Sequence, residues 1–505
     1  MAKADGMGNY FLGIDAGTTL IKTVLFDESG SQVCGASSEN RIYYTEEGGA
    51  EIDLELYWKE LSGSINKVMK VSGVGRDDVK ALAVSAHGVT VVPVDSSGIP
   101  LRRAFSYLDK RGTREARELI DVFGRRQLFA NTGQPNILPV LIPVKVLWMK
   151  YHEPEVFNTF YKLVTVDAYL AYKFTGLWVA TPSISATTGF IKLENGDFWC
   201  ESMEYMGITP ERLGKVKQSG TPIGTLHPKV AKNLGLSEKT LVVCGALDQA
   251  AGCVGTGNLT EGVITESTGT VLAISATVDE PRIDDDRPAP CFAHAVPQKF
   301  IMLPYCLSGG SVLKWFRDEF YEGVDYASIV GSAEGVRAGS DNLLMLPHLT
   351  GADSPEYNSN ARGVFYNIDL RHTRAHFIRA LLEGIGYMLR RNMELLRSLG
   401  LAVDNIRCIG GGSRSKLWNQ IKADITGISV ATFETEEVAA LGAALLASVG
   451  CGFFTSIEEG CRRFVRIKET FVPNENNAHV YDECYERYVE LYRRLEPMFT
   501  EKTSS

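Results

Sequence analysis

The sequence predicts an α/β fold made of two related halves. In the first part of the chain, short apolar runs typical of strands alternate with stretches of helical periodicity, and such alternation favours a parallel or mixed sheet covered by helices. A similar succession of elements begins again near Gly262. The strand-like runs of the first half are 10–14, 23–26, 81–86, 89–94 and 240–245, and its helical stretches are 56–70, 112–129 and 247–254.

A repeated hairpin marks the start of each half. The first copy spans 11–26 around the turn Gly17-Thr18-Thr19, and the second spans 262–274 around Gly269-Thr270. An apolar run, a small turn and a second apolar run form the pattern of a β-hairpin. The backbone N–H groups and the threonine hydroxyl of such a turn suit a phosphate oxygen. Two such turns, one from each half, can face each other across a cleft and hold a polyphosphate.

The remaining elements of the second half continue the α/β pattern. No Pro- or Gly-rich linker separates the halves, so we expect a tight hinge near 255–262. The expected elements are a glycine turn into helix 311–320, helix 376–399, strand 405–409, a glycine turn into helix 415–426, helix 438–449 and a tail helix at 477–496.

Composition narrows the class of protein. A chain of 505 residues is too long for one ordinary core and suggests two large domains. No apolar run is long enough to span a bilayer, and residues 1–9 lack an apolar signal core, so we expect a cytoplasmic protein without a membrane partner. The ten cysteines are scattered, which favours reduced buried thiols over disulfides or a metal site. A net charge of −9 argues against nucleic acid as a partner but not against a nucleotide substrate.

Four motifs together resemble the FGGY carbohydrate kinases, the group that includes glycerol kinase, xylulokinase and gluconate kinase. They occur in the order of that family and cover about residues 10–450, and this chain is most similar to the xylulokinase-like members. The motifs are Asp15-x-Gly17-Thr18-Thr19, the segment 247–252, the Gly269-Thr270 hairpin, and Gly410-Gly411-Gly412-Ser413 followed by Gln420 and Asp424.

The resemblance implies a fold, a domain plan and two cofactors. The fold would be α/β, with two duplicated actin/hexokinase/Hsp70-like (ribonuclease H-like) domains flanking a nucleotide cleft. Residues 10–258 would form a sugar-binding N-terminal domain, 259–452 a nucleotide-binding C-terminal domain, and 453–505 a helical tail packed on the body. ATP and Mg²⁺ would bind, and a homodimer is possible because family members are often oligomers.

The first hairpin carries the candidate magnesium and phosphate residues. Asp15 would hold Mg²⁺ through water, since this ion commonly uses one or two carboxylates plus phosphate oxygens; the alternative is an Asx-turn that only closes the hairpin. Gly17, Thr18 and Thr19 would donate to phosphate. Lys22 would reach the transferring phosphoryl group, and the alternative is an ordinary surface lysine.

Asp248 is the candidate catalytic base. It follows the strand 240–245 at the start of a helix, and clefts of α/β folds open at the carboxyl ends of strands. There it would accept a proton from a sugar hydroxyl and orient the attacking oxygen toward the γ-phosphorus. The alternative is a helix cap. The family's base falls on this position, and we place the adjacent Gln249 with the substrate.

The second half would hold most of the nucleotide. Gly269 and Thr270 form the second phosphate turn. The resemblance places Gly310 and Lys314 near the nucleotide, and the same holds for Gly411 and Ser415, beside the adenine and ribose. The alternative for any glycine-rich turn is plain chain reversal. No Gly-x-x-x-x-Gly-Lys-Ser/Thr motif occurs, which excludes the P-loop kinase class.

Three segments bear on the sugar contacts. His87-Gly88 matches part of the Met-His-Gly of xylulokinases, whereas glycerol kinases carry Arg-Glu there, so both residues are candidate substrate contacts; the alternative is a structural histidine. Asp109 and Arg111 resemble the family's Trp-x-Asp-x-Arg, and either contact the sugar or brace the loop. The segment 180–186 lacks the acidic residue that many relatives have near Pro182.

These motifs predict ATP-dependent phosphorylation of a hydroxyl on a small sugar, with a pentulose such as D-xylulose as the first choice. Other open acceptors are a polyol or sugar acid (a tetritol, gluconate or glycerol) and autoinducer-2. More remote alternatives are an actin- or Hsp70-like ATPase without a sugar acceptor and a silent sugar sensor.

Overall fold

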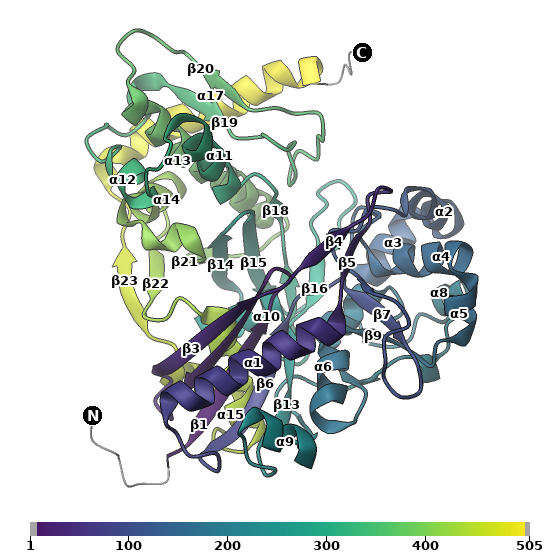
Figure 1. Ribbon diagram of the computed structural model, residues 1–505. Coiled ribbons are helices and arrows are strands. Elements are labelled where there is room, and N and C mark those ends of the chain that lie inside the picture. The colour runs from purple at the N-terminus through teal and green to yellow at the C-terminus, as the bar shows by residue number, and fades with distance from the viewer. Residues whose placement is uncertain (1–7, 500–505) are drawn as a thin grey trace.

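The structure is a computed structural model that describes residues 8–499, and it contains two lobes, each built on one mixed sheet (Figure 1). In the first sheet the strand order is β12-β13-β6-β1-β2-β3. Its strands are β12 (Pro222–Thr225), β13 (Leu241–Leu247), β6 (Val79–Ala86), β1 (Tyr10–Ala16), β2 (Leu20–Phe26) and β3 (Gln32–Glu39).

The second sheet has the order β16-β17-β15-β14-β21-β22-β23, with β18 paired to β15. Both sheets contain a leading hairpin, two strands parallel to its first strand, and an antiparallel edge strand. This shared plan confirms the duplicated α/β fold. The strands are β14 (Gly262–Thr268), β15 (Leu272–Val278), β16 (Cys291–Ala293), β17 (Phe300–Met302), β18 (Tyr305–Cys306), β21 (Val403–Ile409), β22 (Val430–Phe433) and β23 (Ile467–Phe471).

The first lobe carries an inserted region, drawn at the right of Figure 1. A five-stranded sheet with the order β4-β5-β8-β7-β9 forms its base. Its strands are two to four residues long, so they gave little sequence signal. They are β4 (Ile42–Tyr44), β5 (Ala50–Ile52), β7 (Val91–Val94), β8 (Ala104–Phe105) and β9 (Lys162–Thr165), and the region's helices are α2 (Thr113–Phe123), α3 (Arg125–Thr132), α4 (Ile142–His152), α5 (Pro154–Thr159) and α8 (Cys200–Met206).

Helix α1 (Leu54–Ser72) shows how local sequence sets an element. Asp53 caps it by accepting from the N–H groups of Glu55 and Leu56, and Gly73 ends it with φ 67°. By contrast, the single helix expected over 112–129 is two helices. Gly124 separates α2 from α3 with φ 74° and ψ 146°, a conformation that a continuing helix cannot contain.

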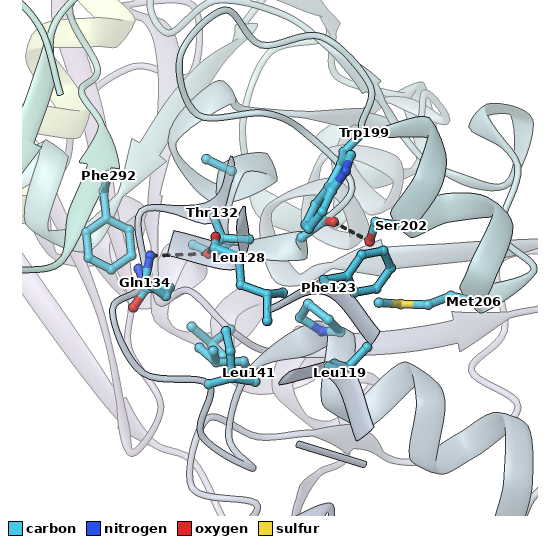
Figure 2. A pocket seen from close by; sticks show the side chains of 16 residues that line it. Leu119, Phe123, Leu128, Thr132, Gln134, Leu141, Trp199, Ser202, Met206 and Phe292 are labelled. Carbon is cyan, nitrogen blue, oxygen red and sulfur yellow. Dashed lines mark hydrogen bonds between the residues drawn. The ribbon is translucent and has the colours of Figure 1, made fainter. Parts of the chain in front are cut away.

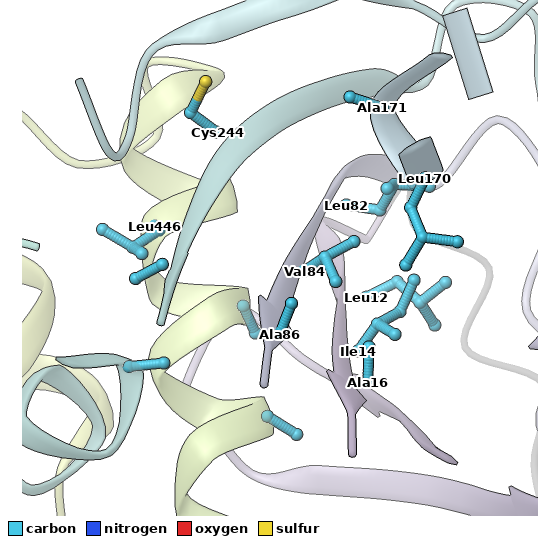
Figure 3. Packing of buried hydrophobic residues seen from close by; sticks show 14 of the residues in the cluster. Leu12, Ile14, Ala16, Leu82, Val84, Ala86, Leu170, Ala171, Cys244 and Leu446 are labelled. Carbon is cyan, nitrogen blue, oxygen red and sulfur yellow. The ribbon is translucent and has the colours of Figure 1, made fainter. Parts of the chain in front are cut away.

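Two helices of small residues join the lobes. Helix α10 (Asp248–Thr256) follows the first sheet, and α15 (Val438–Gly450) comes from the second lobe but packs on β1, β6 and β13 (Figure 3, where Leu446 marks α15). A Cβ atom on Gly442 would lie 1.9 Å from the Ala251 carbonyl oxygen, and one on Gly13 would lie 1.9 Å from that of Ala440. Glycine at these positions therefore sets how closely the lobes approach.

The last part of the chain differs from the expected helical tail. It contains α16 (Ile457–Phe464) and α17 (Glu475–Phe499), but also β23, which completes the second sheet beside β22. Residues 500–505 of the expected tail lie outside the described residues. Across 8–499, no helix is long and apolar enough to cross a membrane.

The other elements connect these parts. They are α6 (Val166–Thr175), α7 (Pro182–Ser185), α9 (Pro228–Leu234), α11 (Gly310–Phe320), α12 (Tyr326–Gly331), α13 (Arg374–Ser398), α14 (Lys416–Thr426), the short strands β10 (Val179–Ala180), β11 (Lys215–Val216), β19 (Leu344–Leu346) and β20 (Val364–Tyr366), and the 3₁₀ turns Ala186–Thr188, Pro210–Arg212, Ser340–Asn342 and Gly411–Arg414.

The glycine contact between α10 and α15 gives a stability prediction. Gly442→Ala should lower the free energy of unfolding by about 1–3 kcal/mol, because its methyl group has no space against the α10 backbone. The matched control is Gly63→Ala in α1, where a Cβ meets nothing within 4 Å; a small gain in stability is expected there. Thermal melts of both variants test this, and a Gly442→Ala protein as stable as the wild type would refute the packing argument.

Candidate active site

Three parallel strands bring the candidate residues to one edge of the first sheet. In the register of β1, β6 and β13, Ala16 lies beside Ala86, and Ala86 lies beside Leu247. Asp15 therefore stands at the end of β1, and His87 and Asp248 directly follow β6 and β13. Side chains at the carboxyl ends of adjacent parallel strands share one cleft edge.

The two carboxylates sit in a partly buried, negatively charged environment. Burial and the charge of Asp15 raise the pKa of Asp248 to about 7, opposed by the Gln249 N–H, which donates to its Oδ1 at 2.7 Å. Burial also raises the pKa of Asp15 to about 6. The Lys22 charge opposes this rise, Glu437 adds to it, and Ser85 Oγ donates to Asp15 Oδ1 at 3.3 Å.

Neither structural alternative accounts fully for these aspartates. Among the described residues, the only hydrogen bond to the Asp15 side chain comes from Ser85, so no Asx-turn closes the hairpin. Asp248 is the first residue of α10, whose N-cap is Leu247, and this helix has no side-chain capping bond; Asp248 Oδ1 accepts from the N–H of Gln249, the next residue. The helix-cap alternative therefore does not describe Asp248. A base that titrates near neutrality is suited to proton transfer at physiological pH.

The site fits a divalent cation in the way Mg²⁺ is usually held. Two carboxylates with raised pKa values lack sufficient compensating positive charge, and Mg²⁺ commonly binds one or two carboxylates together with phosphate oxygens and water. Within residues 8–499 no group of three or more His, Cys, Asp or Glu side chains could hold a metal by itself. The phosphates would therefore have to supply part of the coordination.

Lys22 joins the two lobes. It faces Asp15 across the β1–β2 hairpin, and its Nζ lies 2.7 Å from Oε2 of Glu437, the residue just before α15. Lys22 is thus not a freely solvated surface lysine. Glu437 was missed in the sequence, where it reads only as part of an acidic pair before an Ala-rich helix.

The first turn presents free donors. Its carbonyl oxygens are occupied: Tyr57 Oη donates to the Gly17 oxygen at 2.9 Å, and Asn40 donates through Nδ2 to Thr18 at 2.6 Å and through its N–H to Thr19 at 2.8 Å. Within the described chain, the N–H groups of these three turn residues have no hydrogen-bond partner. The turn is thus held from its carbonyl side, and its donors remain available to an anion.

The second turn lies among the other glycine loops of its lobe. The Gly310 N–H donates to the Gly269 oxygen at 2.8 Å, and the Ser311 N–H donates to that of Thr270 at 3.1 Å. A Cβ on Gly310 would lie 2.4 Å from the Gly269 oxygen, and one on Gly410 would lie 2.9 Å from the Thr268 oxygen. The structure therefore brings together Gly269, Thr270, Gly310 and the loop that contains Gly411.

Two expected nucleotide residues have other partners. Lys314 forms an ion pair with Asp318 one turn further along α11, and its side chain is 63% exposed. The Ser415 hydroxyl caps α14 by accepting from the Trp418 N–H at 3.1 Å. Lys314 would have to leave Asp318 to reach a nucleotide, whereas Ser415 already has a structural role.

His87 presents an unpaired acceptor. Its Nδ1 lies 2.7 Å from the Ala16 carbonyl oxygen, which can only accept, so Nδ1 carries the proton. Burial lowers the pKa of His87 to about 4, and the ring is neutral. Its buried Nε2 has no hydrogen-bond partner within the described residues. Gly88 brings this loop against the residue before Asp248, since a Cβ there would lie 2.7 Å from Leu247 Cδ1.

The other expected sugar residues divide into two kinds. Gln249 reaches the second lobe, where its Oε1 accepts from Ser275 Oγ at 3.5 Å. Asp109 and Arg111 brace a loop: Arg111 Nη2 lies 2.7 Å from Asp109 Oδ2 and 2.9 Å from Glu51 Oε1. The bracing alternative thus describes this pair.

Sequence reasoning missed two residues beside this loop. Lys145 on α4 is buried, donates to the Val89 oxygen at 2.6 Å, and has its pKa lowered to about 7, chiefly by burial. Val89 has φ 62°, so the ammonium group holds a strained turn next to His87 and Gly88. Tyr107 is half exposed, and burial together with the Asp248 charge raises its pKa. A lysine within the apolar run 142–149 was the available signal.

An apolar cavity of the first lobe lies close to this loop but is a different feature (Figure 2). Val89, Leu128, Trp199, Met206 and, from the second lobe, Phe292 line it. Ser202 Oγ donates to the Gly189 oxygen at 2.8 Å, and the Gln134 N–H donates to Thr132 Oγ1 at 3.2 Å. The wall is mostly apolar, and Asp15, His87 and Asp248 do not line it, so we do not assign the sugar to this cavity.

Comparison with known proteins identifies the family. Residues 10–255 match the N-terminal domain of the FGGY family of carbohydrate kinases, and residues 264–451 match its C-terminal domain. The chain is 30% identical over 492 residues to a xylulose kinase of Bacillus subtilis (97% of this chain, 98% of that one), and 28% identical over 506 residues to a gluconokinase of the same species (98% of each).

Solved structures show the same fold. The crystal structure of ligand-bound xylulose kinase from Lactobacillus acidophilus superposes with a TM-score of 0.88 at 26% identity, covering 97% of this chain and 98% of that one. Both family domains are present over nearly the whole length, and the chain therefore belongs to the FGGY family of carbohydrate kinases, which are sugar phosphotransferases.

Proposed function

We propose that the protein transfers the γ-phosphoryl group of ATP to a hydroxyl of a pentulose such as D-xylulose, with Asp248 as the general base. The observation that carries this is the meeting of Asp15, His87 and Asp248 at one sheet edge. In this proposal the domain at 10–258 binds the sugar, and the domain at 259–452 binds most of the nucleotide. The similarity to xylulose kinases supports the choice of sugar.

The reaction would be a direct transfer. Asp248 accepts the proton of the sugar hydroxyl while its oxygen forms a bond to the γ-phosphorus, and the bond from that phosphorus to the β–γ bridging oxygen breaks. ADP leaves with the bonding electron pair. The N–H groups of the two turns and Lys22 donate to phosphate oxygens, and a Mg²⁺ ion held by Asp15 would neutralise phosphate charge.

The neighbouring side chains would orient the acceptor. The lone pair on His87 Nε2 can accept from a sugar hydroxyl, and Lys145 keeps the His87–Val89 loop in place. Gln249 and Tyr107 border the same space next to Asp248. A polyhydroxylated acceptor matches this set of polar groups, and one of its hydroxyls would satisfy the buried His87 Nε2, which otherwise has no partner within the described residues.

A substrate screen tests the proposed acceptor. With ATP and Mg²⁺, ADP release should be fastest with D-xylulose among pentuloses, tetritols, hexonates, glycerol and the autoinducer-2 dihydroxypentanedione. Without an acceptor, release should be far slower, because closure of the lobes excludes water. No response to pentuloses, together with a response to gluconate or a tetritol, would replace the substrate and leave the kinase mechanism standing.

Asp248→Asn tests the base. The amide keeps the shape and can still accept from the Gln249 N–H, but it cannot take a proton, so kcat should fall by about 10²–10⁴-fold. ATP binding, measured by calorimetry, should persist. Turnover within about tenfold of the wild type would rule out Asp248 as the base.

The raised pKa of Asp248 also predicts a pH-dependent effect on stability. A carboxyl whose pKa rises from 3.8 to about 7 on folding stabilises the native state fully below pH 3.8, and this stabilisation is lost as the pH rises toward 7. In the absence of ligands, Asp248→Asn should therefore be more stable than the wild type at pH 8, by about 1–4 kcal/mol, and the gap should narrow toward pH 5. A gap that stays constant with pH would contradict the buried-charge argument.

A further inference from the structure

Five buried polar side chains lie beneath the nucleotide loops of the second lobe. Glu266 and Thr268 come from β14, Cys408 from β21, and Asn419 and Lys422 from α14, and each is at most 1% exposed. Glu266 is paired with Cys408 across the two parallel strands. Strand residues two apart and helix residues three apart share a face, so all five side chains meet between the sheet and the helix.

The members bond to one another directly. Lys422 Nζ donates to Glu266 Oε2 at 2.8 Å and to Thr268 Oγ1 at 2.9 Å. The Thr268 hydroxyl donates to Oε1 of the same carboxylate, and Cys408 Sγ donates to Oε2 at 2.8 Å. Both charged groups are fully buried, and the ion pair has no contact with solvent.

The network reaches both nucleotide loops. At one end, Thr268 immediately precedes the Gly269-Thr270 turn. A Cβ on Gly412 would lie 2.7 Å from the Cβ of Thr268, so the loop 410–415 packs against the same residue. At the other end, Cys408 Sγ lies 3.3 Å from Asn419 Oδ1, and Asn419 Nδ2 donates to the Ser413 carbonyl oxygen at 2.8 Å. One set of polar contacts therefore connects the phosphate turn with the loop 410–415.

The ion pair between Glu266 and Lys422 is not explained by its contribution to stability alone. Replacing a buried ion pair with apolar side chains of similar volume is often neutral or stabilising. A fully satisfied buried network instead fixes one geometry of the groups attached to it. Burial lowers the pKa of Lys422, but Cys408 and Glu266 more than offset this, so its pKa lies above the usual value and the ammonium stays charged.

We propose that Glu266, Lys422 and Thr268 are positioning residues for the nucleotide, which hold the Gly269-Thr270 turn and the loop 410–415 at the separation that a nucleotide needs. This inference rests on the proposed function, because it takes these loops as the nucleotide site. Their effect passes through Thr268, whose hydroxyl is held from two sides and whose backbone continues into the turn.

Thr268→Val and Thr268→Ser test the proposal in the full-length protein. Valine keeps the shape and removes the hydroxyl, so the Kd for ADP, measured by calorimetry, should rise about tenfold through misplacement of the turn. Serine keeps the hydroxyl and should bind within about twofold of the wild type. The matched control is Thr277→Val on β15. It removes a buried hydroxyl that donates to Asn258 Oδ1 at 2.8 Å. The control should lower Tm and leave the Kd for ADP unchanged.

Two results would overturn the proposal. The first is a Thr268→Val protein with a lower Tm but wild-type affinity for ADP, because the network would then be structural only. The second applies if Thr268→Val does not fold. The double variant Glu266→Leu/Lys422→Met then replaces it, because it removes both charges together. Wild-type affinity for ADP in this double variant would equally refute the positioning role. Failure of the wild type itself to bind ADP or ATP would instead reject the proposed function.

Discussion

The register of three parallel strands is the constraint on which the site depends. Because β1, β6 and β13 end at the same level, residues far apart in the chain come together without any long-range contact between their own side chains. A shift of one residue in any of these strands would turn its side chains to the other face of the sheet. Asp15, His87 and Asp248 would then no longer lie together at one edge of the sheet. The apolar core that fixes this register, including Leu12, Ile14 and Val84, is therefore part of the site's geometry (Figure 3).

The second lobe is placed by backbone contact rather than by side-chain fit. Helix α15 approaches β1 and α10 so closely that glycine is required on both sides. This brings Glu437, just before α15, to Lys22 of the first hairpin, and the charge of Glu437 also raises the pKa of Asp15 directly. The charge environment of the candidate magnesium ligand thus depends on how the two lobes meet. A change in the interlobe angle would alter that environment, and this provides a physical link between lobe closure and the electrostatics of the site.

Much of the fold and part of the site could be predicted from sequence, and the reasons differ between residues. Glycine and threonine turns such as Gly17-Thr18-Thr19 have a recognisable local pattern, and the repeat of that pattern indicated the duplication. Of the five-stranded sheet in the insert, only β7 was predicted, within the run 89–94, because the other strands are too short for periodicity to show. Lys145 was missed because a charged residue in an apolar segment shows that a partner is needed, but not which one. Glu437 and Lys422 were missed because each stands near other polar residues, where the local sequence does not distinguish it from a surface charge. Lys314 and Ser415 show the converse limit, since matching positions do not reveal local partners.

The two lobes manage buried charge in opposite ways. In the second lobe, the opposite charges of Glu266 and Lys422 neutralise each other in a fully buried ion pair. In the first lobe, the negative charge of Asp15 and Asp248 is offset only in part by Lys22, and burial together with this excess charge raises their pKa values. Such an excess destabilises the empty protein, but it leaves capacity for a cation and for a transferred proton. Buried charges are thus paired within the protein beneath the loops whose geometry must stay fixed. They are left partly unpaired at the strand ends of the first lobe, where bound ligands would supply the missing positive charge.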